Sequence, residues 1–214
     1  MLTAQIIDVS HHNGDVDFDA LRRAGVLAVI AKATQGTRFV DPRYAGYRKA
    51  ATQLGLLWGA YHFGTCEPVA DQLDHFLATA DLRTADLACL DFEENTSAAA
   101  SMTAEQALQF VQGFKSRMPS RGYPVLYGGA WLKQLLNGKP YPGLSNCPLW
   151  LAQYGPHAEL PPGWSAYKLW QHVEGRAGGT GLDRFDSSLF DGTQAQLRAE
   201  WPFSGAVASA APGH

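Results

Sequence analysis

Short apolar runs, each about the length of a β-strand, recur along the chain and restrict its fold more than any other feature. Helical patterns separate the early runs, and such alternation predicts parallel strands joined by crossover helices. We therefore expect eight strands, which are parallel over roughly the first two-thirds of the chain. The eight runs read AQIIDVS, VLAVIAKA, LLWGAYHF, LACLDFEE, YPVLYGG, CPLWLAQY, YKLWQHV and, more weakly, DRFDSSLF.

Three of the helical segments carry readable signals. An Asp-Pro pair supplies an N-cap and a first helical residue for one of them, and a Thr-x-x-Gln capping box opens another. Apolar residues follow at helical spacing in each segment. One pattern runs from Asp41 until Gly55 stops it, a second is the stripe of Leu73, Phe76, Leu77 and Ala80, and a third runs from Thr103 to Phe114.

The pattern changes after Pro148, where three candidate strands are joined by stretches rich in Pro and Gly that have no helical period. These connections are marginal for crossover helices, which allows the last strands to turn back antiparallel. We predict an α/β fold: an irregular, TIM-like single-domain β/α barrel of about five βα units followed by three strands with few helices. The catalytic barrel would span 1–203 and a flexible tail 204–214. An open doubly wound sheet is the alternative.

Composition limits the partners of the chain. At 214 residues it is long for a minimal domain and short for two. Its net charge of -3, without a basic stripe, argues against nucleic acid or an anionic membrane as partner. The three cysteines form no CxxC pair, so neither zinc nor a disulfide framework is indicated, and we expect no cofactor.

The N-terminal segment lacks the pattern of a signal peptide, and no segment approaches a membrane span. We expect synthesis in the cytoplasm and action outside only after export.

Three carboxylates follow the apolar run that begins near Leu87. Because side chains alternate along a strand, Asp91 and Glu93 would share one face, while Phe92 and Glu94 point to the other. In a barrel the first pair would face the catalytic mouth at the C-terminal strand ends. An exposed acidic loop is the alternative.

The first and last strands carry further carboxylates. Asp8 ends the first apolar run, although it could also cap the turn that follows. Asp186 lies among strand-like residues, whereas turn chemistry explains Asp191 before Gly192. Because the first and last strands of a closed barrel are neighbours, Asp8 and Asp186 could meet beside Asp91 and Glu93. Four carboxyls around one mouth would raise the pKa of at least one, as a general acid requires.

Other side chains are weaker candidates. Lys32 ends the second run and either pairs with a carboxylate or is an ordinary surface lysine. His11 and His12 do not make a convincing metal site, because adjacent residues of extended chain point apart. Cys89 lies inside a buried run and is better explained as core than as nucleophile. The segment GRAGGTG lacks the strand and helix that a phosphate loop needs.

With these residues assembled, the sequence resembles glycoside hydrolase family 25, the muramidases often called Chalaropsis-type lysozymes. The resemblance covers residues 6–192. It rests on eight ordered stretches: IIDVSHHNGDVDF, AVIAKATQGTRFVDP, GLLWGAYHFG, the D-x-E of LDFEE, PVLYGGAW, PLWLAQYG, KLWQH and FDSSLFDG.

The resemblance implies an irregular barrel that hydrolyses the β-1,4 bond between N-acetylmuramic acid and N-acetylglucosamine in peptidoglycan. Glu93 matches the family's general acid, and Asp8, Asp91 and Asp186 match its other carboxylates. Positions that look like substrate contacts are Tyr61, Tyr127, Trp150 and Gln171, to which we add Lys32. We expect a monomer acting on peptidoglycan glycan strands, such as a phage endolysin released by a holin or an effector delivered by a secretion machine.

Two departures from the family pattern stand out. Tyr47 and Arg48 lie where the family often carries Asn, and the loose final motif leaves Asp183 as a rival to Asp186. Two other functions are possible on sequence grounds. One is a family 18 chitinase, whose longer acidic motif is broken by Cys89, and the other is a non-catalytic wall-binding barrel.

Overall fold

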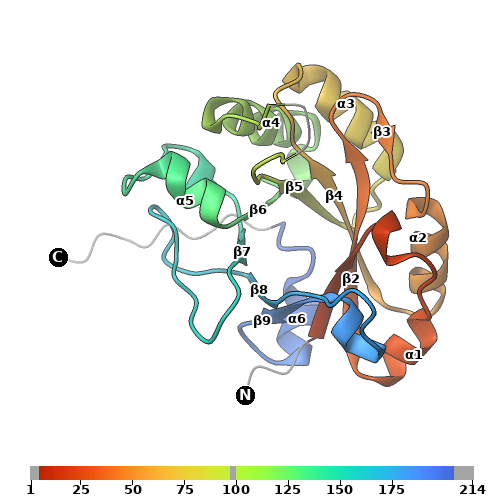
Figure 1. The fold of residues 1–214 in the computed structure, drawn as a ribbon. Coiled ribbons are helices and arrows are strands. Elements are labelled where there is room, and N and C mark those ends of the chain that lie inside the picture. Colours follow the sequence, from red (N-terminus) through yellow and green to blue (C-terminus); the bar gives the residue numbers. More distant parts are fainter. Residues whose placement is uncertain (1–4, 97–99, 205–214) are drawn as a thin grey trace.

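Eight strands close into a barrel in the computed structural model, which describes residues 5–96 and 100–204. Around the barrel the order is β1-β9-β8-β7-β6-β5-β4-β2, and β1 pairs with β2 to close it (Figure 1). The short β3 pairs only with the edge of β2. The strands are β1 Gln5–Val9, β2 Val26–Gln35, β3 Phe39–Val40, β4 Leu57–Phe63, β5 Leu87–Asp91, β6 Val125–Gly128, β7 Leu149–Ala152, β8 Leu169–Val173 and β9 Asp186–Phe190.

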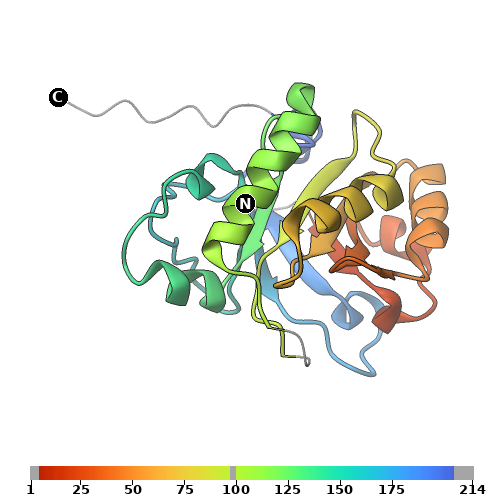
Figure 2. The same cartoon turned by 90° about the horizontal axis from the view of Figure 1, so that it is seen from above.

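Five helices alternate with the first strands, and a sixth follows the last strand. They are α1 Phe18–Arg23, α2 Tyr44–Gln53, α3 Val69–Ala80, α4 Ala104–Arg117, α5 Ala130–Leu136 and α6 Gln194–Glu200. The helices of the first half cover one side of the barrel, whereas loops cover much of the other side (Figures 1 and 2). The five βα units followed by three strands are therefore confirmed. Within the described residues, no helix is both long and apolar enough to cross a membrane.

Sequence patterns and structure differ in three local features. The Asp-Pro pair forms a turn in which the Asp41 carboxylate accepts from the Arg43 N–H, so α2 begins only at Tyr44. Among the last strands only β9 is antiparallel to its neighbours. The connection from β7 crosses back as an irregular loop, so β8 remains parallel to β7. The sequence did not indicate β3.

Two apolar clusters lie against the barrel wall, one on its outer face and one on its inner face. The outer cluster fills the space between strands and helices, and includes Phe76, Phe110 and Phe114. The inner cluster fills the barrel, and Cys89 belongs to it, as expected of a core residue. Trp201 and Phe203, which follow α6, pack into the inner cluster. Of the expected tail at 204–214, only Ser204 lies within the described residues.

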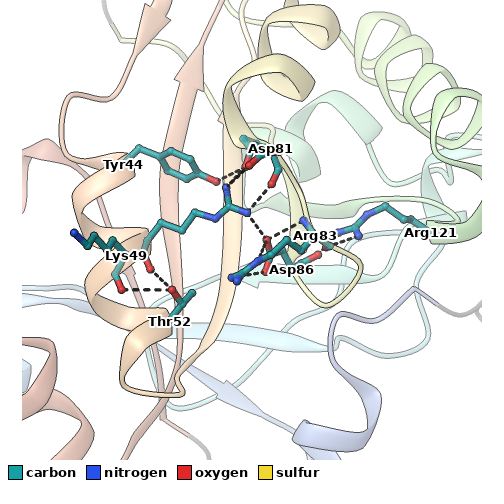
Figure 3. Close-up of polar contacts among 9 residues, drawn as sticks. Tyr44, Lys49, Thr52, Asp81, Arg83, Asp86 and Arg121 are labelled. Carbon is teal, nitrogen blue, oxygen red and sulfur yellow. Dashed lines mark hydrogen bonds and ion pairs between the residues drawn. The ribbon is translucent and has the colours of Figure 1, made fainter.

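The departure at Tyr47 and Arg48 concerns a structural helix, as expected. Tyr47 packs edge-on against Phe18 of α1. The Arg48 guanidinium binds Asp86 with Nη2 to Oδ2 at 2.9 Å and also contacts Asp81 at the end of α3 (Figure 3). Arg48 thus ties α2 to the segment that enters β5, at the end of the barrel opposite the mouth.

Candidate active site

A small cavity of about 100 Å³ lies at the mouth of the barrel, where the parallel strands end. It contains four carboxyl groups, three aromatic side chains and one amide. These come from seven of the barrel strands or the residues directly after them. The lining residues are Asp8, Tyr61, Asp91, Glu93, Tyr127, Trp150, Gln171 and Asp186. All of the predicted site residues except Lys32 therefore line one cavity.

Strand alternation continues past the end of β5. The Phe92 N–H donates to the Tyr127 carbonyl at 3.0 Å, which extends the pairing with β6, and the Phe92 side chain is fully buried in the outer cluster. Asp91 and Glu93 consequently point into the cavity, while Glu94 is exposed. The alternative of an exposed acidic loop is wrong for the first two carboxylates.

The register of the barrel seam brings Asp8 opposite Asp186 in the antiparallel pair β1–β9. Asp186 Oδ1 accepts a hydrogen bond from the Gly175 N–H at 2.7 Å. Its rival Asp183 is exposed on the short helix η4 Gly181–Arg184 and does not line the cavity. The structure therefore brings Asp186, rather than Asp183, to the other carboxylates.

Burial and mutual repulsion disfavour ionisation of all four carboxyls. Burial is the main cause of the strongly raised pKa of Asp8, and the charges of Asp186 and Glu93 add to it. Burial and Glu93 likewise raise the pKa of Asp91 well above its usual range. The pKa of Glu93 is also raised by burial, against the opposing effect of Lys32. The cavity thus favours carboxyl groups that keep a proton at higher pH than usual.

Hydrogen bonds hold some of these side chains in place. The Gln171 amide donates to Asp8 Oδ2 at 2.9 Å and accepts from the Tyr127 hydroxyl at 2.9 Å. The Trp150 indole N–H donates to Ser188 Oγ at 2.9 Å. Ser188, which sequence reasoning missed, is a register neighbour of Gln171 across β8 and β9. By contrast, Asp91 Oδ1 is buried and has no hydrogen-bond partner among the described residues.

Lys32 lies on β2 beside the cavity and is buried. Its Nζ donates to Gln35 Oε1 at 2.6 Å and lies 4.8 Å from the ring centre of Phe63 and 5.6 Å from that of Phe39. Within the described part of the chain, no carboxylate lies in ion-pair range of Nζ, and the side chain is buried, so Lys32 is neither directly paired with a carboxylate nor an ordinary surface lysine. Its charge nevertheless acts on Asp91 and Glu93 at longer range.

The paired histidines serve the turn after β1. His11 Nδ1 lies 2.8 Å from Asp41 Oδ2, which also accepts from the His11 backbone N–H. Across residues 5–96 and 100–204, no group of three or more His, Cys, Asp or Glu side chains is arranged to hold a metal ion.

Two larger hollows flank the central cavity. The first, the β1–β9 groove, has a volume of about 400 Å³ and shares Asp8, Tyr61 and Asp186 with the cavity. The second, the β6–β7 groove, has a volume of about 540 Å³ and shares Glu93 and Tyr127 with it. The three hollows together give a cleft that passes the carboxylates and could hold an extended polymer.

Comparison with known proteins agrees with this arrangement. Residues 7–178 match the family model described as glycosyl hydrolases family 25. Lysozyme M1 of Streptomyces globisporus is 30% identical over 208 residues, which cover 91% of this chain and 70% of that protein. The N,O-diacetylmuramidase of Chalaropsis sp is 28% identical over 204 residues, covering 88% and 96%.

A solved structure confirms the barrel. The bacterial lysozyme from Streptomyces coelicolor has a TM-score of 0.81 at 26% identity, and the match covers 94% of this chain and 98% of that one. Sequence and fold therefore agree over most of the molecule, and the chain belongs to glycosyl hydrolases family 25.

Proposed function

We propose that this glycoside hydrolase is a muramidase, which cleaves the β-1,4 bond between N-acetylmuramic acid and N-acetylglucosamine in peptidoglycan. Its similarity to proteins named lysozyme and N,O-diacetylmuramidase supports this substrate. The observation that carries the proposal is the cavity with four carboxyls at the centre of a long cleft. Glycosidases generally use a protonated carboxyl and an ionised one on the two sides of the scissile bond.

Glu93 is the proposed general acid. It lines both the central cavity and the β6–β7 groove, so its proton can reach an oxygen that joins two sugars lying in these hollows. Its raised pKa keeps the carboxyl protonated at a higher pH than an exposed glutamate would allow. In the reaction Glu93 gives its proton to the glycosidic oxygen as the bond from that oxygen to the anomeric carbon breaks.

Asp91 is proposed to orient the acetamido group of the muramic acid. Its buried Oδ1, which has no partner among the described residues, can accept a hydrogen bond from an amide N–H. An acetamido group held in this way can present its carbonyl oxygen to the anomeric carbon. Attack by that oxygen would close an oxazolinium ring, which water then opens, whereas direct attack by water would give the hydrolysed end in one step. In either case an ionised carboxylate of the cavity would take the proton of the water.

Asp186 and Asp8 complete the proposed set. Asp186 would support the attacking group from the β9 side, and Asp8 would hold water or tune the acid. Their opposed positions in the register place both at the junction with the β1–β9 groove. Tyr61, Tyr127, Trp150, Gln171 and Lys32 are the proposed substrate contacts.

The decisive experiment compares Glu93→Gln with Glu94→Gln on purified peptidoglycan. Loss of the general acid should lower the rate of muropeptide release by about 100-fold to 10,000-fold. Glu94 is the comparison variant, because it is the adjacent glutamate and lies outside the central cavity. It lines the β6–β7 groove, so its loss should change KM rather than kcat. Near-normal activity in a folded Glu93→Gln protein would contradict the assignment.

The same digest identifies the bond that is cut. Borohydride reduction followed by mass spectrometry should find reduced muramic acid at the new chain ends. Reduced glucosamine from chitin would indicate chitinase chemistry instead, and binding without release would indicate a wall-binding protein.

We further propose that the protein acts as a monomer on the bacterial cell wall, after holin-type release or delivery by a secretion machine. Light scattering of the purified protein, alone and with soluble glycan, tests the monomer.

A further inference from the structure

The residues that the central cavity shares with each groove indicate in which direction a glycan would run through the cleft in the proposed reaction. Glu93, which would protonate the leaving sugar's oxygen, is shared with the β6–β7 groove. Asp8 and Asp186 are instead shared with the β1–β9 groove. The leaving sugar therefore lies on the β6–β7 side. The muramic acid would then occupy the central cavity, and the glycan would continue from its C4 into the β1–β9 groove.

Two guanidinium groups lie on the rim of the β1–β9 groove, in the loop between β8 and β9. Arg176 is exposed, and its guanidinium has no hydrogen bond or ion pair to any residue in 5–96 or 100–204. Arg184 donates from Nη2 to the Asn13 carbonyl at 2.9 Å and lies against the Phe185 ring. Arg184 thus remains free to use further N–H donors on a ligand.

The glycine-rich segment 175–181 holds these two arginines side by side. The Arg176 N–H donates to the Asp183 carbonyl at 2.7 Å. A Cβ atom at Gly175 would come within 2.7 Å of the Arg184 carbonyl oxygen, so only glycine allows the two backbone segments to approach this closely. Among residues 5–96 and 100–204, no carboxylate lies in ion-pair range of either guanidinium.

We propose that Arg176 and Arg184 bind a carboxylate carried by the C3 substituent of the muramic acid in the central cavity. This inference rests on the proposed function. C3 is bonded to C4, through which the glycan continues, so the substituent projects toward the β1–β9 groove. Muramic acid carries a lactyl ether there, whose carboxylate is either free or extended by a peptide that bears carboxylates of its own.

The charges around the groove agree with such a ligand. Its inner end, formed by Asp8 and Asp186, would lie against the neutral sugar ring. The rim carries the two guanidiniums, opposed there by Glu174. A substrate with a neutral ring and an anionic substituent matches this division, and arginine binds carboxylates with paired N–H donors.

The test compares kcat/KM of two enzymes on charged and on neutral substrates. The wild type and the double variant Arg176→Gln/Arg184→Gln are each assayed on peptide-bearing peptidoglycan and on glycan stripped of peptide by an amidase. Each substrate is used with its carboxylates free or converted to methylamides. We expect the double substitution to lower kcat/KM about tenfold on the free carboxylates, mainly through KM, and to have little effect on the methylamides.

The two substrates also identify the source of the carboxylate. Loss confined to stripped glycan assigns the lactyl carboxylate, and loss confined to peptide-bearing material assigns the peptide. Arg198→Gln, on α6 beyond the other end of β9, removes the same charge away from the mouth and should change neither ratio.

An equal loss on charged and neutral substrates would overturn the inference while leaving the muramidase proposal intact. Failure of the wild type to release muramic acid ends from any substrate would contradict both.

Discussion

Two buried aspartates flank the same strand of this barrel and have opposite surroundings. Asp86 immediately precedes β5 and Asp91 ends it, and they are 2% and 6% exposed. Asp86 accepts hydrogen bonds from the Arg48 guanidinium, from the Arg83 backbone and from the Arg83 side chain, at 2.9 to 3.3 Å (Figure 3). Asp91 has one oxygen without a partner in the described structure, and Lys32 lies beyond ion-pair range.

The two aspartates are only five residues apart, but Asp86 is placed to stabilise the fold and Asp91 is placed to contact a substrate. A buried carboxylate that is fully paired fixes its neighbours, and removing it leaves buried cations behind. A buried carboxylate that is incompletely paired is destabilising, but it is available to a substrate. At the start of β5, Asp86 therefore joins α2, α3 and the following loop. At the end of β5, which is the open end at the barrel mouth, Asp91 is an incompletely paired carboxyl that a substrate could contact.

Asp86→Asn should produce the largest change in stability. Arg48 would keep only the Asp81 carboxylate, which is 88% exposed and therefore weakly interacting. We expect the free energy of unfolding to fall by about 3 kcal/mol. Thermal or urea denaturation followed by circular dichroism measures it, and activity at low temperature should be retained.

Asp81→Asn is the matched control for this change, because it removes the other carboxylate that contacts Arg48. The residue has a positive φ of 43°, which asparagine tolerates. Its effect should stay below about 0.5 kcal/mol. Equal losses in the two variants would contradict the view that burial makes the Asp86 pairing important.

Asp91→Asn should have the opposite effect on stability, although it disables the site. An amide is less costly to bury than a carboxylate, so we expect unfolding to require about 1 kcal/mol more, or about 2–4 °C in Tm. Activity should fall at least about 100-fold. A lower Tm than the wild type at neutral pH would show that Asp91 is not a destabilising group.

The pH dependence of this gain has a defined sign. Because the folded pKa of Asp91 is raised, the wild type loses stability as pH rises from the ordinary aspartate range through the folded pKa. The stability gained by Asp91→Asn should therefore be present above that pKa. It should disappear at acid pH, where the wild-type carboxyl is protonated and is as neutral as the amide.

The two ends of β5 also differ in how far the sequence predicts them. Alternation along one strand was enough to predict that Asp91 and Glu93 share the cavity, and barrel closure brought Asp8 to Asp186. These relations depend on backbone periodicity and strand order. The aromatic and amide positions came instead from the family resemblance.

The partners of Asp86 depend on how a helix packs, which periodicity does not specify. Arg48 reaches it from α2, and Arg121 reaches its backbone carbonyl from the turn after α4. For the same reason the sequence could not show that Gln35 and two phenylalanine rings surround Lys32. One of those rings, Phe39, belongs to a two-residue strand without a sequence signal.

Lys32→Met tests the weaker, long-range interaction at the open end. Charged or titratable groups that interact with Lys32 are Asp91, Glu93, Asp41, His12 and His62. Removing the cation makes both proposed catalytic carboxyls, Asp91 and Glu93, harder to ionise, so their pKa values should rise. If the acid limb reports ionised Asp91 and the alkaline limb reports protonated Glu93, as proposed, both limbs should move to higher pH. A profile of kcat/KM against pH measures this.

Two variants separate charge from other roles of Lys32. Lys32→Arg keeps the cation and should restore the limbs, whereas Lys49→Met removes a lysine from the exposed face of α2 and should leave them unchanged. If Lys32→Met raises KM without moving either limb, the lysine binds substrate and does not tune the carboxyls. The unpaired oxygen of Asp91 would then gain a partner only when substrate binds. A shift of both limbs would instead show that the Lys32 charge lowers the pKa values of Asp91 and Glu93 from a distance. At that distance the cation offsets only part of the effect of burial.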